Sequence, residues 1–240
     1  MSLSTIIKRN CKTCGKLLIE KSRIKLGKST LVTYQCGHPQ VEQALSVTDY
    51  ASIVTNDEKQ DKLLPYQIEG VKFIEQAAGR ALLADEQGLG KMVQTAAFVK
   101  LHLEELRPVI FTTKTSVKLQ SMWEFVRWTG TKRIQIIQSS KEIAIPGLDI
   151  YITTYDMLKN EKVWAHISPN FVVFDECQAI KDHLSGRAKA AQRIAKDCPF
   201  VLGTSGTYIK NNAGEAFTIF NIIKPSRYPH YQKFLNEKVS

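Results

Sequence analysis

Residues 81–91 read ALLADEQGLGK, and this stretch decides how the chain around it folds. Its four leading apolar residues predict a buried strand, and the pattern after Lys91 predicts a helix. Gly88 and Gly90 let successive backbone N–H groups turn toward phosphate oxygens, and Lys91 can reach the β and γ phosphates of a nucleotide. The alternative is a plain tight turn between a strand and a helix. The candidate phosphate-binding residues are Asp85, Glu86, Gln87, Gly88, Leu89, Gly90 and Lys91.

Short apolar runs recur on both sides of this loop and alternate with helical patterns. Helical patterns span 91–105 and 116–128, and an earlier one begins at Pro65 and can end at Gly79. Strands are expected at 81–84, 109–111, 134–137, 150–152, 171–174 and 200–202. Because apolar runs without alternation indicate strands buried on both faces, we predict an α/β fold with a mainly parallel sheet covered by helices. Ligands of such sheets bind at the carboxyl ends of the strands.

A second candidate for catalysis or metal binding is the acid pair Asp175-Glu176, which directly follows the strand expected at 171–174. A parallel strand that delivers carboxylates at its carboxyl end can place Asp175 on a magnesium ion, directly or through water. Glu176 can then polarise an attacking water. The alternative is an ordinary acidic loop after a buried strand, but the phosphate loop upstream favours a nucleotide site.

Six short motifs follow one another between residues 63 and 225. They lie at Leu64–Gly70, Asp85–Lys91, Pro108–Thr113 with Leu119, Trp123 and Glu124, Ile152–Tyr155, Asp175–Gln178 with Ile180 and Lys181, and Ser205–Thr207 with Ile209, Asn211 and Asn212. In this order they resemble the Q motif and motifs I, Ia, Ib, II and III of helicase superfamily two. Within that superfamily they resemble the Swi/Snf branch of double-stranded DNA translocases and chromatin remodellers.

This resemblance implies a RecA-like P-loop NTPase lobe that binds ATP and Mg²⁺ and contacts the backbone of duplex DNA through motifs Ia and Ib. It also implies that Gln67 reads the adenine edge and that motif III couples the nucleotide state to DNA. The implied catalytic residues are Lys91, Asp175, Glu176 and Gln178, with Asp175 as the magnesium ligand. The implied nucleotide-binding residues are Gln67 and the run from Asp85 through Met92.

Four positions depart from the pattern of that family. Met92 follows Lys91 where the family has a Ser or Thr that ligates magnesium, and a thioether is a poor ligand for so hard an ion. Gln178 stands where the branch usually has His, Tyr208 replaces the motif III proline, and Leu64 replaces an arginine before the Q motif. We expect the lysine and the loop amides still to hold phosphate.

The sequence ends soon after motif III. The resemblance implies a second RecA-like lobe that supplies arginines to the ATP site, and no such lobe follows here. Because an absent arginine finger lowers the rate on the order of 10³–10⁵-fold, we expect this chain alone to bind nucleotide and turn over very slowly. A second lobe or a partner chain is expected to be needed for turnover.

The N-terminal cysteines predict a metal site. Cys11 and Cys14 form a C-x2-C pair, and Cys36 and His38 form a C-x-H pair. Such ligands suit a tetrahedral structural zinc ion, which a module of about 40 residues needs because its own core is too small. The alternative is three unpaired thiols and a surface histidine. We predict a zinc-ribbon-like module over 1–45, a linker over 46–62 and the lobe over 63–240.

Charge is concentrated in the first 40 residues, which hold eight Lys or Arg and one acid in a chain of formal net charge +10. Such a segment suggests a polyanionic partner such as nucleic acid, or else a solvated face. No apolar run approaches the roughly 18 residues of a membrane helix, and no secretory leader is evident. We expect an intracellular protein without a membrane partner, cytoplasmic in a prokaryote or virus and nuclear in a eukaryote.

Three functions therefore compete. The leading one is the ATP-binding lobe of a Swi/Snf-type DNA-dependent ATPase. The second is a non-catalytic module that binds DNA or protein on a degenerate lobe, which Met92 favours. The third is an RNA helicase lobe of the same superfamily, which the motif around Gln67 permits.

Overall fold

The computed structural model describes residues 20–26, 29–34, 39–41, 53–206 and 213–238. In its N-terminal part, β1 (Glu20–Leu26), β2 (Ser29–Tyr34) and β3 (Pro39–Val41) form an antiparallel sheet in that order. The predicted zinc ligands Cys11, Cys14, Cys36 and His38 lie outside the described residues, so the zinc module stays a prediction. Within the described ranges, no group of three or more His, Cys, Asp or Glu side chains could hold a metal ion.

The main body is built on a six-stranded sheet in which all neighbouring strands are parallel. Its strands are β4 (Arg80–Leu83), β5 (Val109–Thr113), β6 (Ile134–Ile136), β7 (Ile150–Thr154), β8 (Phe171–Phe174) and β9 (Phe200–Thr204). The order is β4-β9-β8-β5-β7-β6, so β9 separates β4 from β8. These strands coincide with the six apolar runs of the sequence, which confirms the predicted parallel α/β fold.

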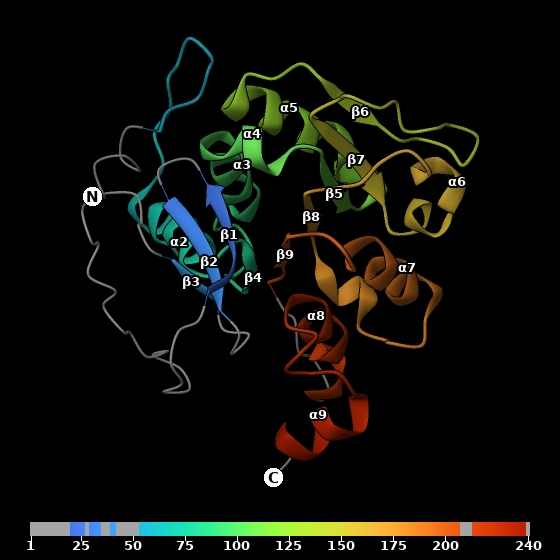
Figure 1. Ribbon diagram of the computed structural model, residues 1–240. Helices are drawn as coiled ribbons and strands as arrows, with labels where there is room; N and C mark the ends of the chain where they lie inside the picture. Colours follow the sequence, from blue (N-terminus) through green and yellow to red (C-terminus); the bar gives the residue numbers. More distant parts are fainter. Residues whose placement is uncertain (1–19, 27–28, 35–38, 42–52, 207–212, 239–240) are drawn as a thin grey trace, which may run out of the picture.

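Helices cover both faces of this sheet (Figure 1). They are α2 (Pro65–Gln76), α3 (Lys91–Leu101), α4 (Leu103–Leu106), α5 (Lys118–Thr129), α6 (Glu161–Trp164), α7 (Gly186–Ala195) and α8 (Phe217–Ile223). The last helix, α9 (Tyr231–Lys238), lies away from the sheet and packs through Phe234 on Phe217 of α8 (Figure 1). On one face α2, α3 and α5 pack on strand residues such as Phe111, Val173 and Leu202. On the other, α6, α7 and α8 pack on the intervening residues, such as Val172 and Val201. The alternation arises because successive strand side chains point to opposite faces.

The helix expected over 91–105 is divided into two. α3 ends at Leu101, and His102 separates it from α4 with φ −129°. The His102 side chain is buried, with its Nε2 atom 3.1 Å from Oε1 of Glu75 on α2 and its ring centroid 5.0 Å from that of Phe98. A contact between α2 and α3, which no local pattern reveals, thus fixes where the first helix ends. Among the described helices, none is long and apolar enough to cross a membrane.

Residues 53–62, which we expected to belong to a linker, contact the lobe. The backbone N–H of Asn56 donates to Arg127 O at 2.6 Å, and its side-chain Nδ2 donates to Trp128 O at 2.9 Å. These bonds satisfy carbonyl groups in the last turn of α5. Arg127 also forms an ion pair with Asp57 at 2.6 Å. The last ten residues of the expected linker therefore cap α5 rather than pass by it.

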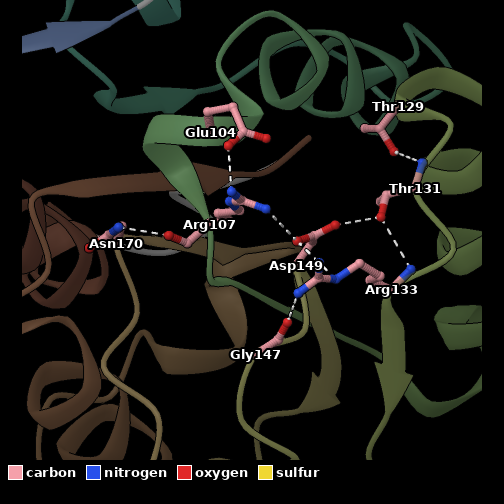
Figure 2. Close-up of polar contacts among 8 residues, drawn as sticks. All are labelled: Glu104, Arg107, Thr129, Thr131, Arg133, Gly147, Asp149 and Asn170. Carbon is pink, nitrogen blue, oxygen red and sulfur yellow. Dashed lines mark hydrogen bonds and ion pairs between the residues drawn. The ribbon is translucent and has the colours of Figure 1, made fainter.

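A buried carboxylate braces the amino ends of the strands (Figure 2). Asp149 directly precedes β7 and is 4% exposed. Its side chain accepts a hydrogen bond from Thr131 Oγ1 at 2.5 Å and one from Arg107 Nη1 at 3.4 Å, and it lies 3.6 Å from Arg133 Nε. Its backbone O accepts from Val109 N at 2.8 Å. Asp149 therefore ties β5 and β7 together, and its charge is balanced within the fold.

Candidate functional site

Thr113, Asp175 and Thr204 stand in one row at the carboxyl ends of β5, β8 and β9. The row follows from the strand register, because the residues immediately before the three are paired with one another. Thr113 Oγ1 donates to Asp175 Oδ2 at 2.7 Å, and Thr204 Oγ1 donates to Oδ1 at 2.8 Å. Asp175 thus lies at the expected edge of the sheet, and each of its carboxylate oxygens accepts a hydrogen bond from one threonine hydroxyl.

The predicted phosphate loop joins β4 to α3, as expected from the sequence. Gly88 and Gly90 have φ values of 87° and 68°, in the left-handed region that glycine adopts without strain. Lys91 is 8% exposed, and its Nζ donates to the backbone O of Asp85 and of Glu86 at 2.8 Å each. The ammonium group therefore points back into the loop, where its donors are satisfied by carbonyl groups.

Gln67, the residue expected to read adenine, lies beside this loop. Its Oε1 accepts from the backbone N–H of Leu64 at 3.0 Å, at the start of α2. Its Nε2 packs so closely on Gly90 that a Cβ atom built there would be 2.5 Å away. The structure thus brings the expected base-reading amide and the phosphate loop together, although they are more than 20 residues apart in the sequence.

Sequence reasoning misses Gln94, one turn into α3. Its Nε2 donates to Asp85 Oδ2 and to Leu89 O at 3.0 Å each, so it holds both ends of the loop. Its Oε1 packs against Gly70, where an added Cβ would be only 1.6 Å away, so position 70 must lack a side chain. A buried polar residue three positions after Lys91 is the signal that could have revealed it.

Motif II is connected to motif III and to the phosphate loop. Glu176 has φ 52°, a left-handed conformation that costs a non-glycine residue about 1 kcal/mol or more and is common at functional sites. Gln178 Nε2 donates to Glu176 Oε2, and Ser205 Oγ donates to Gln178 Oε1 at 2.8 Å. Gly206 packs on Gln87, whose Cγ would be 2.8 Å from a Cβ at that position. Motifs I and II therefore meet Ser205 and Gly206 of motif III at one edge of the sheet, whereas Thr207, Ile209, Asn211 and Asn212 of that motif lie outside the described residues.

The residues at this edge fit a magnesium ion that is held largely by phosphate and water oxygens. Mg²⁺ is commonly bound through one or two carboxylates together with substrate phosphates and water. Asp175 supplies such a carboxylate. Met92 supplies no oxygen, and its side chain packs on the hydrophobic core under α2, α3 and α5. The donor set therefore suits an ion that arrives with a nucleotide.

The residues of motif Ib are mostly buried. Ile152, Thr153 and Tyr155 are all buried, and only Thr154 is partly exposed. The Tyr155 hydroxyl donates to Asp175 O at 2.7 Å, and burial raises the pKa of Tyr155 well above its usual value. The side chains of these three residues therefore lie inside the fold, because both faces of β7 are covered by helices, and contact of motif Ib with the DNA backbone stays a prediction. Tyr155 instead links motif Ib to motif II.

Comparison with known proteins identifies the fold and motifs together. The sequence profile of the SNF2-related domain family matches residues 66–239. The chain belongs to this family. The resemblance to Swi/Snf-type ATPases of helicase superfamily two is thereby confirmed. SNF2-related proteins are helicase-like ATPases that hydrolyse ATP.

Individual relatives agree with this assignment. The SWI/SNF-related matrix-associated actin-dependent regulator of chromatin subfamily A-like protein 1 of Xenopus tropicalis is 29% identical over 177 residues, which are 72% of this chain and 18% of that protein. The DNA excision repair protein ERCC-6-like of Bos taurus is 30% identical over 193 residues, covering 71% and 15% respectively. The SNF2-related lobe thus spans less than a fifth of these two relatives.

A solved structure supports the same fold. The Sulfolobus solfataricus SWI2/SNF2 ATPase core in complex with dsDNA superimposes with a TM-score of 0.66 at 25% sequence identity. The match covers 81% of this chain and 40% of the archaeal chain. The SNF2-related lobe therefore corresponds to less than half of that ATPase core.

Proposed function

We propose that this chain is the ATP-binding lobe of a Swi/Snf-type DNA-dependent ATPase. It binds ATP with Mg²⁺ at the carboxyl ends of β4, β8 and β9, and it binds the backbone of duplex DNA. The observation that carries the proposal is the connection of the phosphate loop to the acid pair. Ser205 and Gly206 make that connection, through Gln178 on one side and Gln87 on the other. A separate lobe, on the same chain or another, completes the site for turnover.

In the proposed nucleotide complex, Lys91 exchanges its partners. Without nucleotide, its Nζ donates to the carbonyl groups of Asp85 and Glu86. When the nucleotide binds, the same donors turn to the β and γ phosphate oxygens. The backbone N–H groups around Gly88 and Gly90, together with the N-terminus of α3, add donors and partial positive charge. Gln67 lies on the adenine side of the loop.

For hydrolysis, Glu176 accepts a proton from the water that attacks the γ phosphorus, and ADP and phosphate leave. Gln178 donates to the Glu176 carboxylate and so holds it in place. A bound Mg²⁺ ion would neutralise part of the phosphate charge, and Asp175 is the residue that would bind this ion. Because Gln178 also accepts from Ser205, movement of motif III reaches the carboxylate that orients water.

The proposed DNA-facing surface includes α5. Leu119 and Trp123 lie one turn apart on this helix and are 57% and 60% exposed. The archaeal ATPase core, which shares this fold, was solved with double-stranded DNA. This likeness supports duplex DNA over RNA as the polymer, and competition between the two at one stated salt concentration distinguishes them.

The test is equilibrium binding of a fluorescent ATP analogue, titrated with and without Mg²⁺. We expect binding that Mg²⁺ strengthens, and we expect Lys91→Ala to lose most of it. Lys189→Ala is the matched control, because Lys189 is an exposed residue of α7 on the other side of the sheet. Binding that survives Lys91→Ala, or no binding by the parent chain, would contradict the proposed ATP site.

A second candidate function is a non-catalytic DNA- or protein-binding module. Met92 favours it, because its thioether packs into the core and leaves the first turn of α3 without a metal-binding hydroxyl. Nucleotide binding that ignores Mg²⁺, combined with DNA binding, is the result that selects this function over the ATPase lobe.

A further inference from the structure

The carboxylate of Asp175 is held by neutral groups alone in the described part of the chain. Both of its oxygens accept threonine hydroxyls, from Thr113 at 2.7 Å and from Thr204 at 2.8 Å. None of the ion pairs between described residues includes Asp175. A carboxylate at the end of a buried strand, with two hydroxyl donors and no cation partner among the described residues, is suited to receive a cation from outside.

The two threonines are themselves shielded from water. Thr113 and Thr204 are each 1% exposed, whereas Asp175 is partly exposed. They end the two strands that flank β8, so their hydroxyls approach Asp175 from opposite sides. A carboxylate bonded from both sides has little freedom to rotate, because any rotation breaks at least one hydrogen bond with a buried donor.

The residue directly after Lys91, in the first turn of α3, offers no side-chain oxygen to a metal ion. Met92 occupies the position directly after Lys91, and its side chain packs on the core that contains Phe98 and Phe111. A metal ion bound with a nucleotide therefore depends more strongly on Asp175 than it would if position 92 carried a hydroxyl.

We propose that Thr113 and Thr204 are positioning residues for the magnesium-binding carboxylate and compensate for the missing hydroxyl at position 92. This inference rests on the proposed function, because it concerns the same nucleotide site. The threonines fix both oxygens of Asp175, and one lone pair of each oxygen is left for the ion or its water. Hydroxyls orient the carboxylate without neutralising it, whereas a guanidinium in their place would compete with the ion.

The expected size of the effect follows from outer-shell partners in metal sites, whose loss typically weakens metal binding by about 10–100-fold. The measured quantity is the Mg²⁺ enhancement, which we define as the dissociation constant of a fluorescent ATP analogue without Mg²⁺ divided by that with Mg²⁺. Thr113→Val and Thr204→Val should each lower it by roughly tenfold while leaving the Mg²⁺-free constant unchanged, and the double variant should lower it further.

Two kinds of control separate positioning from simple packing. Thr112→Val is the matched control, because Thr112 is the preceding residue of β5, is fully buried, and has a hydroxyl without a hydrogen-bond partner in the described structure. It should keep the full Mg²⁺ enhancement. Thr113→Ser and Thr204→Ser retain the hydroxyl and should also keep it. Thermal unfolding of each variant shows that the lobe remains folded.

The outcomes distinguish this inference from the function on which it rests. If the parent chain binds no nucleotide, the proposed function fails and the inference fails with it. If the parent binds with a clear Mg²⁺ enhancement that both valine variants retain, the ATP site stands and the positioning role of the threonines is refuted. Loss of the enhancement in Thr112→Val as well would also refute it, because the effect would then be one of packing.

Discussion

Two aspartates at opposite ends of the central sheet are both bonded by threonine hydroxyls, and yet their surroundings differ. Asp149, at the amino end of β7, accepts from Thr131 and lies against the guanidinium groups of Arg107 and Arg133 (Figure 2). Asp175, at the carboxyl end of β8, is held by two hydroxyls and has no cation partner among the described residues.

The difference indicates which carboxylate serves the fold and which is available for a ligand. The charge of Asp149 is balanced by residues that also pair elsewhere, since Arg107 bonds Glu104 and Arg133 bonds Gly147 O (Figure 2). Removing it leaves donors without an acceptor, so its loss is a stability effect. Asp175 has no arginine or lysine paired with its carboxylate in the described structure. Its loss should therefore be felt by a bound cation more than by the fold.

Asp175→Asn tests the ligand side of this comparison and should give the largest effect. We expect the Mg²⁺ enhancement of ATP-analogue binding to fall by about 100-fold or more, since even outer-shell losses weaken metal binding by about 10–100-fold. Urea unfolding should show a stability loss of about 1 kcal/mol, because the asparagine oxygen accepts one threonine hydroxyl while the other loses its acceptor and no buried cation is left unpaired. A large loss of stability with unchanged Mg²⁺ enhancement would reverse the assignment.

Asp149→Asn is the counterpart on the structural side. It should lower the free energy of unfolding by about 2 kcal/mol, the size expected for hydrogen bonds to a charged group, because both arginines are partly exposed and water compensates some of the loss. Urea denaturation measures this change. The Mg²⁺ enhancement of the folded variant should equal that of the parent chain, and a reduced enhancement would show that the two carboxylates are coupled.

The fold and the identity of Asp175 could be predicted from the sequence because both leave local signals. Four apolar residues followed by acids mark the end of a buried strand, and a glycine-rich stretch before Lys91 marks a phosphate loop. The roles of Thr113 and Thr204 could not be predicted, since they depend on the strand order. Their partner Asp175 lies 62 and 29 residues away in the sequence, and only the β9-β8-β5 arrangement brings the three together.

The same reason explains the contacts that sequence reasoning missed. Tyr155, directly after β7, is buried and donates to the backbone O of Asp175, which lies 20 residues away in the sequence. Gln94 supports the phosphate loop only because Gly70, on another helix, leaves room for its amide. Residues 53–62 look like a polar linker in the sequence, and the carbonyl groups that they cap belong to α5. Each depends on a contact between distant segments.

Met92→Thr sharpens the comparison by adding a hydroxyl to the first turn of α3, directly after Lys91. It should raise the Mg²⁺ enhancement by up to about tenfold and lower the unfolding free energy by about 1–2 kcal/mol, because Met92 contributes partly buried packing to the core. Nucleotide titrations and urea unfolding measure the two effects. Met92→Leu keeps the packing without a hydroxyl and should leave the enhancement unchanged; a gain with leucine would contradict the metal-based explanation.

A third carboxylate allows the contributions of hydroxyl and guanidinium to be separated. The pKa of Asp57 is lowered from 3.8 to about 2, first by the hydrogen bond from Thr55 and next by that from Arg127. Because this folded-state pKa is depressed, its contribution to stability is present above about pH 4 and is lost as the pH falls through about 2.

Thr55→Val and Arg127→Gln should each raise the pKa of Asp57 toward 3.8, because the first removes the hydroxyl hydrogen bond and the second removes the guanidinium hydrogen bond together with its charge, so the acid loss of this contact begins at a higher pH in both variants. NMR titration of the labelled Asp57 carboxyl carbon measures both shifts. A variant in which the pKa of Asp57 stays near 2 would show that the side chain removed does not stabilise the carboxylate. A clear rise of the Asp57 pKa on loss of the Thr55 hydroxyl alone would strengthen the argument that the hydroxyls of Thr113 and Thr204 are enough to hold Asp175 in place for a metal ion.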